Sequence, residues 1–204
     1  MNCHFFDLDG TLIKGNISFH FVKWLHKKGH MSLWALFRCV VDYALYALNL
    51  VQATFIHQRI YRQFFCHLEP KELQQWVGQF FKETTLTYHQ ECLERLRKAL
   101  KENVPVILLS SSPDFLVEPL GKKLRVTHCI ATHYGNQGVE VIVGEAKTAA
   151  ASQLTKDLSK CVAYADHLSD LPFLERVGKP VVVAPNGRLS RLANSRGWEV
   201  IDAT

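Results

Sequence analysis

Short apolar runs alternate with amphipathic segments along the second half of the chain. Each run has the length and the continuous apolar character of a strand that is buried on both faces. The segments between them have helical spacing, as in 91–100, where Leu93, Leu96 and Leu100 share one face. Strands that alternate with helices predict an α/β fold with a mostly parallel sheet and right-handed crossovers. The expected strands are 2–6, 104–109, 126–131, 161–165, 180–184 and 198–201.

Four further elements complete this half. The turn at 135–138 predicts a hairpin that continues into 139–143. Helices are expected over 114–123, 147–158 and 189–195.

The first half of the chain has a different pattern, which is helical from about residue 17 to residue 101. Glycine, asparagine and proline divide this region at 28–30, around Asn49 and at 68–70. Pro70, followed by Glu72, has the features of a helix start.

Residues 33–56 are apolar over a length that could cross a bilayer. Arg38 and Asp42 lie within this stretch at helical spacing, and each charge at a bilayer centre costs about 2.5–3.5 kcal/mol on insertion scales. A simple span is therefore disfavoured. Two interpretations stay open: a buried helical hairpin, or a surface that rests on a membrane. In the second, the interfacial residues are Trp24, Trp34, Lys23, Lys27 and Lys28.

The composition narrows the class of protein. With 48% hydrophobic and 21% charged residues among 204, the chain can form a sizeable core and is not expected to be disordered. The net charge of +5 is dispersed, which argues against a nucleic-acid partner. Six cysteines stand far apart without a C-x-x-C pair, and no basic region followed by an apolar one opens the chain. These features predict a reducing, cytoplasmic location.

Candidate chemistry begins directly after the first strand, in the sequence Asp7-Leu8-Asp9-Gly10-Thr11-Leu12. Two carboxylates that close together are unfavourable when buried unless a cation shares them. Asp7, Ser110 and Asp166 each follow the last apolar residue of an expected strand. Since ligands bind beyond the carboxyl ends of parallel strands, these groups are expected at one rim of the sheet.

Four separated pieces resemble the haloacid dehalogenase (HAD) superfamily: the Asp7–Leu12 segment, the apolar strand ending in Ser110, Lys147, and the Asp166–Asp170 segment. The helical insertion after the first piece resembles the α-helical cap of the phosphoserine phosphatase-like branch. The resemblance implies a Rossmann-like, mostly parallel sheet flanked by helices, with an inserted α-helical cap domain. Residues 1–14 and 86–204 would form the catalytic core, and residues 15–85 the cap.

The resemblance also implies an activity, a Mg²⁺-dependent phosphatase that works through an aspartyl-phosphate. Asp7 would be the nucleophile, and Asp9 the general acid and base whose backbone carbonyl also binds the metal. Asp166 would complete the Mg²⁺ site, with Asp170 in support. The remaining groups, Ser110, the backbone N–H of Ser111, and Lys147, would hold the substrate phosphate.

The substrate and some alternatives stay open. Phosphoserine phosphatases usually carry a glutamate after the first motif, and residues 13–17 contain no acid. The aromatic, apolar cap suggests a small phosphorylated metabolite with an apolar portion, or a lipid-phosphate headgroup. The alternatives are a membrane-associated lipid-phosphate phosphatase (phosphatidylglycerophosphate-like) at the inner face of the membrane, a phosphomutase, and a non-catalytic phosphate- or membrane-binding module. His167, beside the Asp166 loop, is expected to face solvent or to support the site.

Overall fold

Within the residues that the computed structural model describes (2–47, 50–135, 138–183 and 188–201), seven strands form one sheet. The order across the sheet is β4-β3-β2-β1-β5-β6-β7. All neighbouring pairs are parallel except β3 and β4, which form the predicted hairpin. The strands are β1 (His4–Phe6), β2 (Val106–Pro113), β3 (His128–Gly135), β4 (Gly138–Glu140), β5 (Val162–Ala165), β6 (Lys179–Val183) and β7 (Glu199–Ile201).

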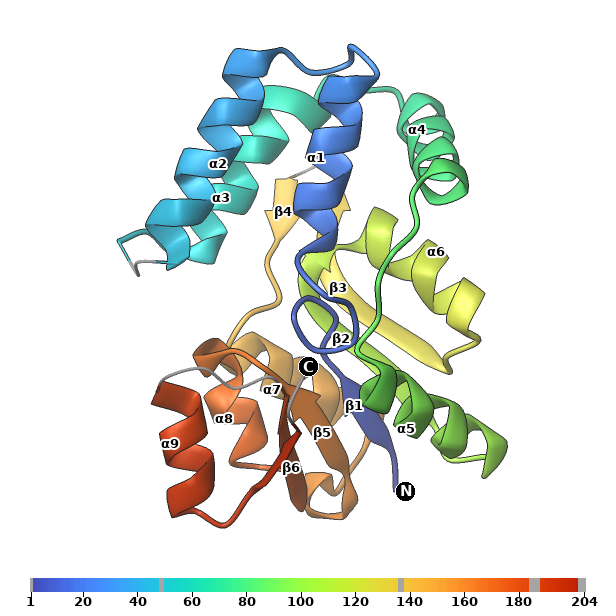
Figure 1. Cartoon of the computed structure of the whole chain (residues 1–204), viewed down its shortest axis with the longest axis vertical. Helices are drawn as coiled ribbons and strands as arrows, with labels where there is room; N and C mark the ends of the chain where they lie inside the picture. The colour runs from blue at the N-terminus through green and yellow to red at the C-terminus, as the bar shows by residue number, and fades with distance from the viewer. Residues whose placement is uncertain (1, 48–49, 136–137, 184–187, 202–204) are drawn as a thin grey trace.

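Side chains alternate between the two faces of this sheet, and those on each face pack into a separate apolar core. Phe6 and Leu108 belong to one cluster, and their neighbours Phe5 and Ile107 belong to the other. Helices α5 (Gln90–Lys101) and α6 (Asp114–Leu124) cover the first face, and the remaining helices of this half cover the second. These are α7 (Glu145–Leu154), α8 (Leu171–Leu174) and α9 (Arg188–Ser195), with the short 3₁₀ turns η2 (Leu158–Lys160) and η3 (Leu168–Asp170). The predicted parallel α/β fold is confirmed (Figure 1).

The central strand β1 lies between β2 and β5, so that three carboxyl ends meet at one rim. Phe6 is in register with Leu108 of β2 and Tyr164 of β5. The strand order reverses direction at this point, which is where open α/β sheets bind ligands. One prediction is corrected here: β2 does not end at Leu109 but continues, with an irregular register, to Pro113.

Helices α1 to α4 lie between β1 and α5 in the chain and together on one side of the molecule (Figure 1). Asn16 caps the first of them by accepting a hydrogen bond from the N–H of Phe19 at 2.9 Å. The predicted breaks at 28–30 and 68–70 are confirmed, while Asn49 lies outside the described residues. The elements are α1 (Ile17–Lys27), α2 (Leu33–Ala47), α3 (Ala53–Ile60) with its π-helical continuation η1 (Tyr61–Phe65), and α4 (Pro70–Glu83).

The chain leaves and re-enters the sheet layer at one place. Ile13 forms an antiparallel bridge with Tyr88, and the N–H of Lys14 donates to the carbonyl of Thr87 at 2.8 Å. Above this crossing, Phe21 and Phe80 pack edge to face with ring centroids 5.3 Å apart. Two adjacent chain segments, which pass Ile13 and Tyr88, therefore connect the helical insertion to the sheet. The insertion and the sheet also share an apolar core.

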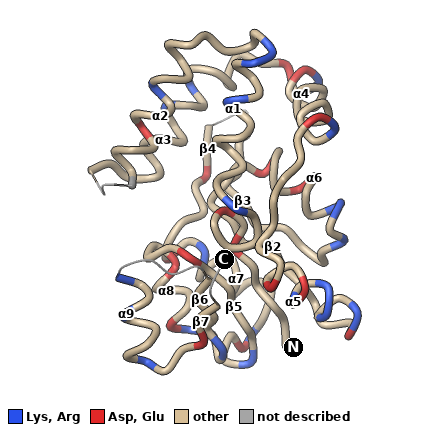
Figure 2. Tube along the Cα trace, in the orientation of Figure 1, with Lys and Arg blue, Asp and Glu red and all other residues tan. Residues whose placement is uncertain are grey.

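The stretch 33–56 does form a helical hairpin, but the first of the two open interpretations, a buried hairpin, is wrong for α2. Leu33, Trp34 and Phe37 on α2 are 69%, 68% and 54% exposed, because α1 and α3 cover only one side of an apolar helix. Figure 2 shows how few charged residues α2 and α3 carry. Arg59 of α3, and not Arg38, pairs with Asp42 at 3.0 Å.

The interfacial role predicted for Trp24 is also wrong. Its side chain is 6% exposed, and its indole N–H donates to Glu83 at 2.9 Å. Trp34 remains as the exposed tryptophan of the predicted pair. Across the described residues, no helix combines the length and the apolar character needed to cross a membrane.

Candidate active site

A tight turn after β1 presents the first two carboxylates. Gly10 has φ +76°, and its N–H lies 3.0 Å from the carbonyls of both Ile13 and Gly15. A Cβ at this position would lie 2.1 Å from Oδ2 of Asp166. Glycine is therefore required twice, by the left-handed backbone and by the close approach of the carboxylate from the loop after β5.

Lys147 joins two of the predicted acids. Its Nζ lies 2.8 Å from Oδ1 of Asp7 and 2.8 Å from Oδ1 of Asp170, and the residue is 2% exposed. Burial opposes the charge on Lys147, but the attraction of Asp170 and Asp7 raises its pKa above the ordinary value. Burial raises the pKa of Asp7 well above its usual range, and Lys147 opposes that rise. The lysine thus holds Asp7 in place at the end of β1.

Asp9 occupies a separate environment with two hydrogen-bond donors. Its Oδ1 accepts from the N–H of Ile17 at 2.6 Å, and its Oδ2 accepts from the hydroxyl of Ser112 at 2.5 Å. The Ser112 oxygen lies 3.0 Å from the hydroxyl of Ser18 at the start of α1. Burial raises the pKa of Asp9, and the bonds to Ser112 and Ile17 oppose this. Ser112 was missed in the sequence, where the only available signal was its place in the Ser110–Ser112 run.

Removal of the Ser112 hydroxyl should reduce turnover more than substrate affinity. In Ser112→Ala, one oxygen of Asp9 loses its donor, so the carboxylate is no longer fixed. We expect kcat to fall about tenfold, the factor for a hydrogen bond to a charged group worth about 1.5 kcal/mol, with KM nearly unchanged. Steady-state kinetics measure both values. Ser152→Ala, on α7, serves as the matched control, and an equal loss in both variants would contradict a role for Ser112 at Asp9.

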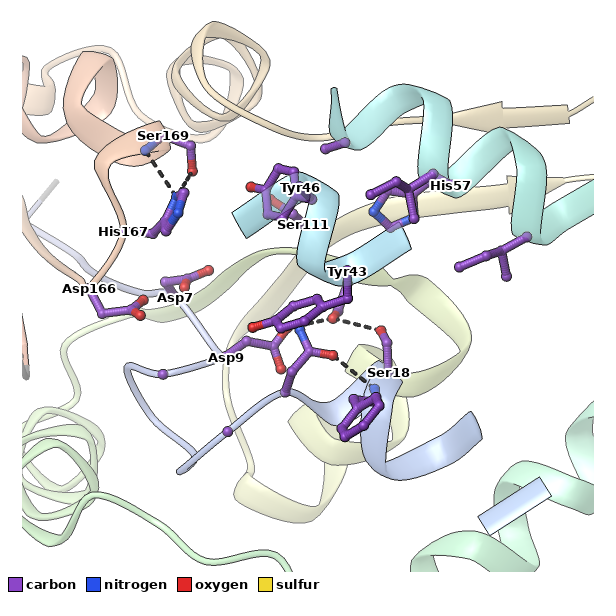
Figure 3. Close-up of a pocket in the computed structure, with 18 of the residues that line it drawn as sticks. Asp7, Asp9, Ser18, Tyr43, Tyr46, His57, Ser111, Asp166, His167 and Ser169 are labelled. Carbon is purple, nitrogen blue, oxygen red and sulfur yellow. Dashed lines mark hydrogen bonds between the residues drawn. The ribbon is translucent and has the colours of Figure 1, made fainter. Parts of the chain in front are cut away.

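Asp166 lies against the turn after β1. Its Oδ1 accepts from the hydroxyl of Thr11 at 3.0 Å. Burial, together with the nearby charge of Asp170, raises the pKa of Asp166 to about 6, while the Thr11 bond opposes this. Figure 3 shows Asp7, Asp9 and Asp166 grouped at the end of β1. The predicted convergence of acids from opposite ends of the chain is therefore present in the structure.

The two predicted phosphate-binding serines differ in position. Ser111 lines the cavity above the carboxylates. Ser110 lies beneath the surface at 1% exposure, and its hydroxyl accepts from the N–H of Ser112 at 3.1 Å. His167 is exposed and its Nδ1 lies 2.9 Å from the hydroxyl of Ser169. Both His167 and Ser169 line the cavity, so His167 is at its rim.

The cavity has a volume of about 280 Å³ and two contrasting sides. Among the described residues that line it, the charged ones all lie on the sheet side, namely Asp7, Asp9, Lys147, Asp166 and Asp170. The opposite side comes from α1, α2 and α3, and Figure 3 shows Tyr43, Tyr46 and His57 there.

The acids carry more negative charge than the one buried lysine balances. No three His, Cys, Asp or Glu side chains among the described residues form a group that could by itself hold a metal ion. Lys147 contacts the Asp170 carboxylate, and the N–H of Ile17 and the hydroxyl of Ser112 donate to the Asp9 carboxylate. Asp7 and Asp166 keep oxygens that Lys147 and Thr11 do not contact, and hard oxygen donors of this kind suit Mg²⁺.

A family model described as haloacid dehalogenase-like hydrolase matches residues 4–175. The chain belongs to this family. The match includes β1 and β5, which the acids follow, as well as β2 with its serines and the whole helical insertion, so the predicted membership is confirmed.

Relatives of this HAD-like hydrolase agree with the assignment. It is 29% identical to the inhibition of morphological differentiation protein of Streptomyces azureus, over 97% of this chain and 77% of that one. It is 24% identical to a phosphoserine phosphatase of Mycobacterium tuberculosis, over 97% and 70%. A crystal structure of a protein of unknown function from Bordetella pertussis Tohama I has the same fold, with a TM-score of 0.86, 24% identity and coverage of 100% and 99%.

Family and relatives together confirm the predicted enzyme class. The HAD-like hydrolase is assigned to the phosphoric monoester hydrolases.

Proposed function

We propose that this enzyme hydrolyses a phosphomonoester through an aspartyl-phosphate on Asp7. One observation carries the proposal: Lys147 holds the Asp7 carboxylate at the floor of a cavity, while Asp9 is held separately beside it. A nucleophile and a proton donor need such separate environments, since one must be ionised and the other must exchange a proton.

In the first step, an Asp7 oxygen attacks phosphorus and the bond to the leaving alcohol breaks. Asp9, whose pKa is raised by burial, gives its proton to the departing oxygen. In the second step, water attacks the phosphorus, Asp9 takes the proton from this water, and the bond to Asp7 breaks. The products are inorganic phosphate and the alcohol, and both acids return to their starting states.

The groups around Asp7 bind and orient the transferring phosphoryl group. Lys147 balances its negative charge, and the Ser111 N–H with Ser110 beneath it forms the polar wall on the β2 side. Mg²⁺ would be held by Asp7, Asp166 and the backbone carbonyl of Asp9, with Asp170 in support through Lys147. The metal would supply charge neutralisation on the phosphoryl oxygens.

Removal of divalent metal should abolish the activity. Asp7 is buried, Asp9 and Asp166 are half-buried, and all three have raised pKa values, so a substrate phosphate adds negative charge that one lysine cannot balance. We expect hydrolysis of p-nitrophenyl phosphate to fall at least about 10³-fold in EDTA, as for loss of several kcal/mol of charge stabilisation. Added Mg²⁺ should restore it, with Ca²⁺ as the matched control for charge alone. Full activity in EDTA would contradict the metal site.

We further propose that residues 1–14 and 86–204 form the catalytic core and residues 15–85 a cap. The bridge between Ile13 and Tyr88 supports these bounds, because the chain enters and leaves the helical part beside itself. The cap supplies Phe19, Tyr43 and His57 to the cavity. It would therefore contact the part of the substrate that leaves as the alcohol.

A second candidate role is contact with a membrane surface, which would suit the lipid-phosphate headgroup predicted as an alternative substrate. One observation favours it: Leu33, Trp34, Phe37, Val40 and Val41 lie on α2 and are 38–69% exposed. We call these five residues the α2 patch. Several large apolar side chains on one element mark an interaction surface rather than ordinary exposure.

Vesicle sedimentation tests this second role. If the α2 patch inserts into the interface, Trp34→Ser combined with Phe37→Ser should lower binding to phosphatidylcholine–phosphatidylglycerol vesicles at least about tenfold, since each side chain contributes about 1.5–3 kcal/mol when buried. Leu154→Ser removes a single exposed apolar side chain outside the patch and is the matched control. Equal sedimentation of all three proteins would contradict membrane contact through α2.

A further inference from the structure

The side of the cavity formed at the sheet is charged, and we call it the floor. The opposite side, formed by α1, α2 and α3, carries no charged side chain among the described residues, and we call it the roof. Among the described residues that line the cavity, those from α1, α2 and α3 include no Asp, Glu, Lys or Arg. Most are apolar or aromatic: Phe19, Val22, Tyr43, Tyr46, Ile56 and Ile60. The ion pair that joins α2 and α3, Arg59 with Asp42 at 3.0 Å, contributes neither side chain to the lining. An ammonium or carboxylate on the substrate would thus be desolvated without an opposite charge from these helices.

His57 is the polar side chain that α3 adds to this roof. Its Nδ1 lies 2.8 Å from the hydroxyl of Tyr134 on β3, which leaves Nε2 as the other ring nitrogen for a substrate. Burial lowers the pKa of His57 to about 4, so the ring is neutral near pH 7.

Tyr134 is itself fixed by aromatic packing. Its ring meets Phe65 and Phe115 edge to face, with centroids 5.9 and 5.4 Å away. The Tyr61 hydroxyl donates to the carbonyl of the next residue, Gly135, at 2.8 Å. The partner of His57 is therefore held in place before any substrate arrives, which lowers the entropic cost of a hydrogen bond to the ring.

Either hydrogen-bond direction between Tyr134 and His57 selects the same kind of ligand group. If Tyr134 donates, Nε2 carries the proton and donates to the substrate; if Nδ1 donates, Nε2 accepts. A neutral hydroxyl satisfies both cases because it donates and accepts. A carboxylate satisfies only the first, and an ammonium only the second.

We propose that the substrate is the phosphate ester of an uncharged alcohol with an apolar body and a second hydroxyl, and that His57 binds that hydroxyl. This inference rests on the proposed phosphomonoesterase function and adds the class of leaving group. It separates this enzyme from its relative that is named for phosphoserine, because a serine leaving group brings both an ammonium and a carboxylate.

A series of phosphate esters tests whether the roof favours an apolar, uncharged leaving group. With Mg²⁺ present, kcat/KM should rise about fourfold for each methylene from methyl to butyl phosphate, the factor for about 0.8 kcal/mol per buried CH₂. O-phospho-L-serine should be at least about 100-fold poorer than butyl phosphate, because its two charges lose water without gaining an opposite charge from α1, α2 or α3. Equal kcat/KM for phosphoserine and butyl phosphate would overturn the inference.

His57 is tested by a ratio measured within each variant, so that differences in folding or overall activity cancel. The ratio compares kcat/KM for 4-hydroxybutyl phosphate with kcat/KM for butyl phosphate. In His57→Phe it should fall about tenfold, the upper end for one neutral hydrogen bond. His57→Gln should restore much of it, and His67→Phe, which removes an exposed histidine, should leave it unchanged. An unchanged ratio in His57→Phe would overturn the role of His57.

Binding of the corresponding phosphonates, measured by calorimetry, keeps this test independent of turnover. Pentylphosphonate, 5-hydroxypentylphosphonate and 2-amino-4-phosphonobutanoate, in which CH₂ replaces the ester oxygen, should show the same order of affinity as the esters show in kcat/KM. If no ester were hydrolysed, the proposed function would be wrong. The order of phosphonate affinities would still show whether the roof prefers an uncharged ligand. Tight binding of the amino acid phosphonate would contradict an uncharged ligand.

Discussion

Asp7→Asn is expected to abolish turnover while leaving the fold intact. The asparagine amide has nearly the shape of the carboxylate, but it cannot form the aspartyl-phosphate on which both steps depend. We expect kcat to fall by on the order of 10⁴-fold or more, since removal of a covalent nucleophile disables the whole catalytic unit. Lys147 keeps its second partner, Asp170, at 2.8 Å, so no buried charge is left alone. Thermal unfolding should therefore occur at the wild-type temperature or above it.

The intermediate itself can be measured. After rapid acid quenching with substrate, the peptide that contains Asp7 should carry one phosphoryl group in the wild type and none in Asp7→Asn. Asp157→Asn, which replaces an aspartate that caps η2 away from the cavity, is the matched control and should keep both turnover and labelling. Labelling of any other residue, or turnover that survives in Asp7→Asn, would contradict Asp7 as the nucleophile.

Much of the fold could be predicted because its sheet is buried on both faces. Continuous apolar runs such as Val106–Leu109 and Val181–Val183 can only be central strands, and their alternation with helices fixes a parallel sheet. The predictions of the end of β2 and of the burial of α2 were wrong because tertiary contacts determine both. β2 runs on through three polar serines because β3 pairs with it again beyond them, at Pro113 and Thr132. The apolar α2 gave no sign of which side its neighbours would cover.

The floor of the site was predictable and its roof was not. Asp7, Asp166 and Lys147 follow strands or begin a helix at positions that topology brings to one rim, and their chemistry restricts their roles. Ser112, Ser18 and His57 act through partners that lie 103, 94 and 77 positions away. A single serine or histidine on a helix or strand has no local feature that points to such a partner. These residues became visible only when the helical insertion was placed over the sheet.

Lys147→Met is expected to destabilise the protein as well as inactivate it. The lysine is 2% exposed and contacts carboxylates on two elements. Removal of one member of a buried ion pair costs about 3–5 kcal/mol, because the remaining charges lose their compensation. Urea denaturation should show a loss of this size in the free energy of unfolding. Lys156→Met, at an exposed position after α7, is the control and should change it by less than about 0.5 kcal/mol.

A second substitution separates this effect from a simple packing defect. Adding Asp170→Asn to Lys147→Met removes one uncompensated charge, so it should recover part of the lost stability without recovering activity. Urea denaturation of the single and double variants measures the difference. A double variant no more stable than Lys147→Met alone would show that methionine merely packs badly, and would contradict the charge bridge between Asp7 and Asp170.

The stability deficit of Lys147→Met should also depend on pH. Burial already raises the pKa of Asp7 well above its usual range, and Lys147 opposes that rise, so the pKa should increase further in the variant. A carboxyl with a raised pKa in the folded state binds a proton more tightly there than in the unfolded chain. Its ionisation therefore costs stability as the pH rises, and this cost disappears below the folded-state pKa. The deficit should shrink as the pH is lowered from about 8 towards about 5, which urea denaturation across this range measures. A deficit independent of pH would contradict the uncompensated charge as its cause.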